Sequence, residues 1–153
     1  MKVILYQPQI PQNTGNIART CSVTNSELIL VKPLGFSTAN RHLKRAGLDY
    51  WEDINVTLID DLFTYLHCLE NQEVHFYFFS SHASSAYSEI MFKSNDILIF
   101  GSETKGVSEE FWKEWPEKFY TIPMSSSSRC LNLSNAVSIV LYEGLRQQNF
   151  LIL

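Results

Sequence analysis

The chain has 153 residues, of which 45% are apolar and 18% charged, and its formal net charge is −4. This length and composition predict a single globular domain over residues 1–153. The net charge excludes a uniformly basic nucleic-acid-binding coat but leaves room for a local basic patch. The apolar run after Lys2 is too short for a signal peptide or a membrane span, so we expect a cytoplasmic protein.

Six short apolar runs of β-type residues predict strands, and helical spacing of apolar residues predicts helices after most of them. This alternation is typical of an open α/β sheet. In chain order the predicted elements are a strand at 2–6, a helix capped by Asn13 or Thr14, a strand at 27–31, a helix at 37–47, a strand at 55–59, a helix at 60–69, strands at 74–79 and 96–100, a helix capped by Ser108, a strand at 120–124, and a helix over 137–148 capped by Ser134 or Asn135.

Three polar side chains follow one flank of the first predicted helix. Asn13, Asn16 and Arg19 are spaced three residues apart, so they lie along its first two turns, just after a strand. Two interpretations stand at this point. The segment is either a helix cap followed by a solvated face, or a set of polar groups held toward a ligand.

The helix predicted at 37–47 carries a compact cationic face. Arg41, Lys44 and Arg45 are spaced i, i+3, i+4, and His42 lies close by. In an acidic chain this face is the best candidate for a contact with phosphate, although charged helix faces are also common as plain solvated surface.

The cysteines and histidines do not form a recognisable metal site. The three cysteines are odd in number and lack a CxxC or Cys/His spacing, which argues against a disulfide framework and a zinc site. His67, His75 and His82 follow no ligand spacing, so we interpret them as surface or partly buried residues.

A loop bracketed by two glycines follows the strand predicted at 96–100. Gly101 and Gly106 would let the backbone approach a flat ligand closely, which a side chain would prevent. The loop is not a phosphate loop, because the Lys-Ser/Thr ending is missing. The acidic residues Glu109 and Glu110 at the start of the next helix would also repel a pyrophosphate.

The segment that organises the chain is the polar loop at 125–135, between the last strand and the last helix. It mixes hydroxyl groups with Arg129 and Asn132, and Leu131 and Leu133 interrupt it. A loop that merely connects would favour Gly, Asp or Pro. We therefore interpret this segment as a binding loop.

Three polar segments each follow the carboxyl end of a predicted strand, the edge at which open α/β sheets bind ligands. At these residues the chain resembles the SPOUT class of S-adenosylmethionine-dependent RNA methyltransferases. Within that class it resembles the TrmL (YibK-like) family, which methylates the ribose 2′-oxygen of the wobble nucleotide of tRNA. The resemblance covers essentially the whole chain. Its motifs are NTGNIAR at 13–19, FGSETKG at 100–106, IPM at 122–124 and RCLNLSNA at 129–136, with LDY at 48–50.

The resemblance implies an α/β-knot fold, a mostly parallel sheet with helices on both faces. Its C-terminal segment would thread through a loop to make a deep trefoil knot, an exception to the rule that chains stay unknotted. The crossing loops of the knot would bind S-adenosylmethionine. It further implies a homodimer in which Arg19 reaches a site built largely by the partner. The residues carried over as cofactor-binding are Phe79, Gly101, Glu103, Gly106, Ile122, Met124, Cys130, Leu131 and Leu133.

The implied reaction moves a methyl group from a sulfonium to a ribose hydroxyl, so the protein must align that hydroxyl and help to remove its proton. The resemblance gives Arg19 and Asn132 the catalytic part. Because a guanidinium stays protonated in proteins, we expect Arg19 to orient the hydroxyl and stabilise the developing alkoxide. The expected RNA partner is the anticodon stem-loop of a tRNA. The residues expected to contact it are Arg41, Lys44, Arg45, Lys105 and Arg129.

One residue departs from the family pattern. The family usually carries Ser after the arginine of its third motif, whereas this chain has Cys130, a larger residue and a weaker donor. A backbone contact to the cofactor at this position would be insensitive to the change. A side-chain contact to the substrate would be weakened.

Two alternatives remain beside the wobble-position methyltransferase. The first is an enzyme of the same class that acts on another tRNA or rRNA position. We expect no additional RNA-binding domain in a chain this short, which favours a small tRNA stem-loop as the target. The second is a non-catalytic RNA-binding module on the same fold, against which the motif glycines and Arg19 argue.

Overall fold

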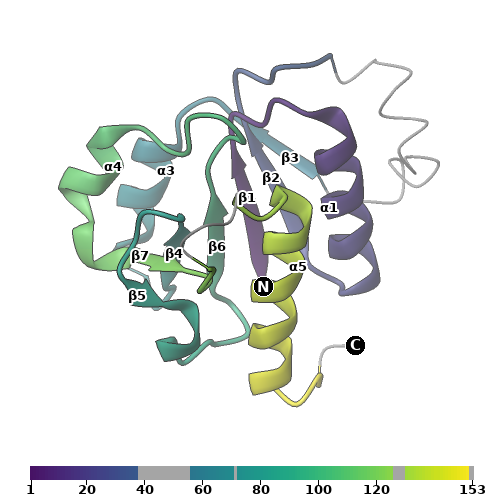
Figure 1. Cartoon of the computed structure of the whole chain (residues 1–153), viewed down its shortest axis with the longest axis vertical. Helices are drawn as coiled ribbons and strands as arrows, with labels where there is room; N and C mark the ends of the chain where they lie inside the picture. The colour runs from purple at the N-terminus through teal and green to yellow at the C-terminus, as the bar shows by residue number, and fades with distance from the viewer. Residues whose placement is uncertain (38–55, 71, 126–129, 152–153) are drawn as a thin grey trace.

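The computed structural model describes residues 1–37, 56–70, 72–125 and 130–151, and its frame is a seven-stranded sheet. The strands lie in the order β3-β2-β1-β6-β4-β7-β5, and all neighbours are parallel (Figure 1). The predicted parallel α/β sheet is confirmed. The strands are β1 Lys2–Tyr6, β2 Glu27–Val31, β3 Val56–Ile59, β4 Phe76–Phe79, β5 Ser85–Ala86, β6 Ile97–Phe100 and β7 Phe119–Thr121.

Three strands differ from the prediction, and one of them, β4, begins at Phe76, two residues after its predicted start. β5 forms inside the small-residue segment 80–86, because its two residues pair with β7 at the edge of the sheet. β7 ends at Thr121, so the chain has already left the sheet at Ile122 and Pro123. Proline has no N–H to give to a strand ladder, which fits the early end of this strand.

Helices cover both faces of the sheet, with α1 and α5 on one face and α3 and α4 on the other (Figure 1). The helix predicted at 37–47 lies outside the described residues. Among the described helices, none is long and apolar enough to cross a membrane. The helices are α1 Pro11–Val23, α3 Leu62–Leu69, α4 Glu109–Glu114 and α5 Leu133–Gln147, with 3₁₀ turns at Tyr87–Glu89 and Pro116–Lys118.

The capping predictions for α1 and α4 need correction. α1 begins at Pro11, earlier than expected, because proline suits the first helical position, where its missing N–H is not needed. The predicted caps Asn13 and Thr14 therefore lie inside the helix. Ser108 stands before α4 as predicted, but its hydroxyl donates to the Glu110 carboxylate at 2.7 Å instead of capping the helix.

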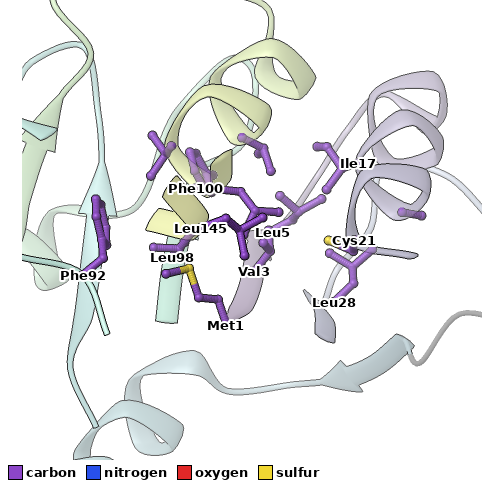
Figure 2. Packing of buried hydrophobic residues seen from close by; sticks show 14 of the residues in the cluster. Met1, Val3, Leu5, Ile17, Cys21, Leu28, Phe92, Leu98, Phe100 and Leu145 are labelled. Carbon is purple, nitrogen blue, oxygen red and sulfur yellow. The ribbon is translucent and has the colours of Figure 1, made fainter. Parts of the chain in front are cut away.

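Two apolar cores lie on the two faces of the sheet. One packs the sheet against α1 and α5 and includes Leu5 and Leu145 (Figure 2). The other packs it against α3 and α4 and includes Ile4 and Phe111. Neighbouring strand residues such as Ile4 and Leu5 point to opposite faces. Both faces are buried, which explains why the strands read as continuous apolar runs.

The strand order determines where a ligand site can form. From β1 the chain runs outward to β2 and β3, and it later returns to place β6 on the other side of β1. At such a switch point the loops at the carboxyl ends of the strands diverge and leave a crevice. In this chain the two loops at that point, residues 7–10 after β1 and 101–108 after β6, are joined by hydrogen bonds through Glu103.

Candidate functional site

A cavity of about 280 Å³ lies at the carboxyl edge of the sheet, on the β6 side of the switch point. Its wall is built by β4 and the loop after it, by the loop after β6 with one residue of α4, and by the chain from β7 into α5. Segments far apart in the sequence therefore share one cavity. The lining residues are Phe79, Ser80, Ser81, His82, Phe100, Gly101, Ser102, Glu103, Thr104, Lys105, Gly106, Val107, Trp112, Thr121, Ile122, Met124, Cys130, Leu131, Leu133 and Ala136.

The two glycines shape the loop after β6. The backbone N–H groups of Ser102 and Gly106 each donate to the other's carbonyl at 3.0 Å, which closes a tight turn. Gly106 has a φ of +66°, in the left-handed region that glycine adopts without steric cost. A Cβ on Gly101 would lie 2.3 Å from the Gly106 carbonyl carbon. The close backbone approach predicted at these glycines therefore occurs within the loop itself.

All nine residues predicted to bind the cofactor line this cavity. The structure also brings Lys105, predicted to contact RNA, to the same wall. Sequence reasoning missed Trp112, which comes from α4 and stacks on Phe119 with the ring centroids 3.5 Å apart. No spacing in the sequence marks that tryptophan. The nine are Phe79, Gly101, Glu103, Gly106, Ile122, Met124, Cys130, Leu131 and Leu133.

The two residues predicted to act in catalysis lie outside the cavity wall. Arg19 is exposed on α1, and Asn132 is exposed immediately before α5. Neither belongs to the lining that the described part of the chain provides. The other residues predicted to contact RNA lie outside the described residues: Arg41, Lys44, Arg45 and Arg129.

A series of polar contacts joins the three motif segments. The Glu103 carboxylate accepts hydrogen bonds from the backbone N–H groups of Gln9 and Ile10, at 2.8 and 3.1 Å. It also accepts one from Asn13 Nδ2 at 3.0 Å. Asn13 Oδ1 in turn accepts one from Asn132 Nδ2 at 3.0 Å. The first motif therefore contacts both the second and the third.

Asn132 is also the cap of α5, where Ser134 or Asn135 was predicted. Its Oδ1 accepts hydrogen bonds from the Ser134 backbone N–H at 2.9 Å and from the Ser134 hydroxyl at 2.6 Å. Further along α5, the Ser138 hydroxyl lies 3.5 Å from the hydroxyl of Thr20 on α1. Polar contacts thus hold α1 to α5 in addition to the shared apolar core.

The three cysteines occupy different environments. Cys130 is exposed at the cavity, where its thiol donates to the Ser81 hydroxyl at 3.4 Å across two segments of the wall. Cys68 is exposed on α3. Cys21 lies on the buried face of α1, and burial raises the pKa of its thiol to about 12. Within the described ranges, no cluster of His, Cys, Asp or Glu side chains could hold a metal ion.

Comparison with known proteins identifies the family. The model of the SpoU rRNA methylase family matches residues 1–142 of this chain. The chain belongs to that family. A protein of Geobacillus stearothermophilus is 46% identical to this SpoU-family chain, over 98% of the chain and 96% of its own length. The tRNA (cytidine(34)-2′-O)-methyltransferases of Methylovorus glucosotrophus and Yersinia pestis are 42% and 38% identical, over 97% and 98% of this chain and 96% and 95% of theirs.

Solved structures of SpoU-family proteins have the same fold. A structure described as giving insight into the 2-OH methylation of C/U34 on tRNA superposes with a TM-score of 0.88 at 38% identity, covering 97% of this chain and 96% of that one. AviRb from Streptomyces viridochromogenes, in complex with AdoMet, superposes with a TM-score of 0.82 at 21% identity, over 97% of this chain and 58% of AviRb. The resemblance to ribose methyltransferases of the tRNA wobble nucleotide is confirmed.

Proposed function

We propose that this protein transfers a methyl group from S-adenosylmethionine to the ribose 2′-oxygen of the wobble nucleotide of tRNA, a cytidine or a modified uridine. The observation that carries this proposal is the near full-length match to relatives that act on cytidine 34 of tRNA. The geometry supports it, because the motif residues of this chain that were carried over as cofactor-binding converge on one cavity at the carboxyl edge of the sheet.

The residues that line the cavity suit S-adenosylmethionine by their chemistry. Leu131 and Leu133 would offer apolar surface to the adenine, and the backbone around Gly101 and Ile122 would offer N–H and C=O groups to the polar edges of the molecule. The space against Gly101 is already filled by the loop's own backbone, so the wall is set before any ligand enters. When bound, the cofactor supplies an electrophilic methyl group on a sulfonium.

The residues of the chain then align and stabilise the reacting hydroxyl. A ribose 2′-hydroxyl is a weak acid, so its developing negative charge must be stabilised as the methyl group moves. Arg19 supplies a permanent positive charge and a planar set of donors for that task. A water molecule or an RNA phosphate takes the proton. Asn132, beside the two leucines of the cavity wall, helps to position the groups around the hydroxyl.

A homodimer completes the site in this proposal. Arg19 lies on α1 outside the cavity wall of its own chain, and α1 packs against α5. Val23 of α1 is 64% exposed, and Ile139 and Tyr142 of α5 are 37% and 44% exposed. These side chains give both helices apolar surface that a second copy would bury. Arg19 would then reach the partner's cavity.

The segment after β7 would thread through a loop to form the deep trefoil knot. Residues 1–153 would form one domain that works in the cytoplasm.

The anticodon stem-loop would be held by Lys105, which is exposed at the cavity. It would also be held by cations outside the described residues: Arg41, Lys44, Arg45 and Arg129.

The proposed function is tested by transfer of a labelled methyl group from S-adenosylmethionine to unmodified total tRNA. Nuclease digestion then identifies the labelled nucleoside and its position. We expect the label on the ribose of a wobble cytidine or modified uridine. Label at another nucleotide would keep the reaction and reject the wobble position. Cofactor binding without any label, on tRNA or on rRNA, would favour the non-catalytic RNA-binding module.

Thiol alkylation tests the cavity without any RNA. We expect iodoacetamide to modify the exposed Cys68 and Cys130 and to spare Cys21, because that buried thiol stays protonated at neutral pH. Saturating S-adenosylmethionine should protect Cys130 and leave Cys68 reactive, which mass spectrometry of peptides would show. Cys68 is the matched control within the same chain. Equal modification of Cys130 with and without the cofactor would contradict this placement of the cofactor.

A further inference from the structure

Asn13 is the central member of the polar series that joins the motifs. It lies in the first turn of α1 and is 5% exposed. Its two amide atoms contact Glu103 and Asn132, which are 90 and 119 positions away in the chain. A single side chain therefore connects the cofactor loop, the helix that carries Arg19, and the cap of α5.

The chemistry of the two neighbours fixes the identity of this side chain. A carboxylate can only accept, so the Asn13 atom that faces Glu103 must be the amide nitrogen. The other atom must then be the oxygen, which accepts from Asn132 Nδ2. An amide supplies a donor and an acceptor on one planar group, whereas an aspartate of the same size supplies acceptors alone.

Simple capping of α1 does not account for the contacts of Glu103. The backbone N–H groups that donate hydrogen bonds to the Glu103 carboxylate belong to Gln9 and Ile10, which precede the helix. Its third partner is the Asn13 side chain, and not a backbone N–H of the first turn. The other charged side chain of its loop, Lys105, is exposed. None of the three groups that contact the Glu103 carboxylate titrates.

We propose that Asn13 is a positioning residue for the methyl transfer. By holding α1 to Glu103 and to Asn132, Asn13 fixes the position of α1 along its axis and its rotation about that axis. Both determine where Arg19 lies relative to the cofactor cavity. Arg19 stands six residues further along the same helix, about 9 Å along its axis, so a rigid helix carries this placement to the guanidinium. The inference rests on the proposed function, because it concerns the residue assigned to stabilise the reacting oxygen.

The test is Asn13→Asp, which keeps the size of the side chain and its acceptor toward Asn132. The second oxygen would face the Glu103 carboxylate, 3.0 Å away in the present geometry. Two carboxyl groups in contact do not easily ionise together. They take up and release protons as a coupled pair. We expect the transfer rate to fall by about 10- to 100-fold at pH 8.5, since small misplacements of reacting groups have effects of this size. The rate should recover as the pH falls and the pair takes up a proton.

A second substitution should rescue the first. In Asn13→Asp/Glu103→Gln the glutamine amide can donate to the introduced carboxylate, which restores one hydrogen bond with donor and acceptor exchanged. The Ile10 N–H, which donates to the same Glu103 oxygen as Asn13, loses its acceptor in this variant. The double variant should therefore regain part of the lost rate and lose the added pH dependence. The matched control is Gln12→Glu, which adds the same charge at an exposed neighbouring position of α1. It should leave the pH profile unchanged.

Thermal denaturation across pH gives a readout that does not depend on catalysis. In the folded Asn13→Asp protein the paired carboxyl groups bind a proton more tightly than in the unfolded chain. Its stability should therefore fall, relative to the wild type, as the pH rises. Glu103→Gln in the same background should remove that slope.

The outcomes separate this inference from the proposed function. An Asn13→Asp variant with a wild-type rate and pH profile would overturn the positioning role. If Asn13→Asp lost the same fraction of the rate at all pH values and Glu103→Gln did not rescue it, Asn13 would have a structural role only. Absence of methyl transfer by the wild type would reject the proposed function and the positioning role with it. The stability measurements would then still show whether Asn13 and Glu103 interact.

Discussion

Replacing Arg19 by alanine is expected to lower the rate of methyl transfer to tRNA by about 10²- to 10³-fold, the usual cost of losing one group that stabilises a developing oxyanion. S-adenosylmethionine affinity should stay nearly unchanged, because Arg19 lies outside the cavity wall. Arg19→Lys keeps the positive charge but not the planar fork of donors, so an intermediate rate is expected. Single-turnover kinetics and calorimetric titration of the cofactor would measure the two effects separately.

The control for this experiment removes a cation that lies away from the cavity. Lys113 is 79% exposed on α4 and pairs with Glu109 at 3.6 Å, an exposed contact that contributes little to stability. Lys113→Ala should keep both the rate and the affinity. Near-normal turnover of Arg19→Ala would reject the role assigned to Arg19.

The second large effect is expected from Gly101→Ala. The added Cβ would lie 2.3 and 2.5 Å from the carbonyl carbon and Cα of Gly106, and 2.6 Å from the Val107 nitrogen. These are backbone atoms, so the loop itself must move, and overpacking of this kind costs about 1–3 kcal/mol. We expect cofactor affinity to fall by at least about tenfold, equivalent to 1.4 kcal/mol. The melting temperature should also fall by several degrees, about 2–4 °C for each kcal/mol.

Gly144→Ala is the matched glycine control. Its added Cβ would meet the end of the Met1 side chain, with the Met1 methyl carbon 2.4 Å away, and that flexible group can move aside. It lies in α5, where alanine is favoured over glycine as a helix residue. Cofactor affinity should therefore match the wild type. Unchanged affinity in Gly101→Ala, measured on protein that is folded by its melting curve, would contradict the proposed wall of the site.

The two variants together test whether Arg19 acts across a dimer. A mixed dimer purified through two different tags would hold one Arg19→Ala subunit and one Gly101→Ala subunit. If Arg19 reaches the partner's cavity, one of the two sites is intact and the other carries both changes. With the cofactor well below its dissociation constant, the mixed dimer should then show about half of the wild-type rate, as expected for two equivalent sites in a symmetric dimer. If Arg19 acts at the cavity of its own chain, only the site with tenfold weaker cofactor binding keeps Arg19, and the rate should fall to about one-twentieth of the wild type.

Local sequence signals predicted most strands well but misplaced the caps of α1 and α5. Strands such as β1 and β2 are buried on both faces, so their continuous apolar runs are visible without the structure. Several polar residues near the start of α5 satisfy the same capping rule. Asn132 is the cap that the structure uses, and its amide nitrogen also contacts Asn13, which no local rule considers.

The sequence by itself determined an open α/β sheet and three polar motif segments at the carboxyl ends of strands, and its resemblance to a family supplied the nine residues that line one cavity. Only the tertiary structure decided how these segments meet. Glu103 and Asn132 reach Asn13 across 90 and 119 positions of chain, and Trp112 enters the wall from α4. Such contacts depend on the order of strands in the sheet. Side-chain spacing along the chain carries no information about that order.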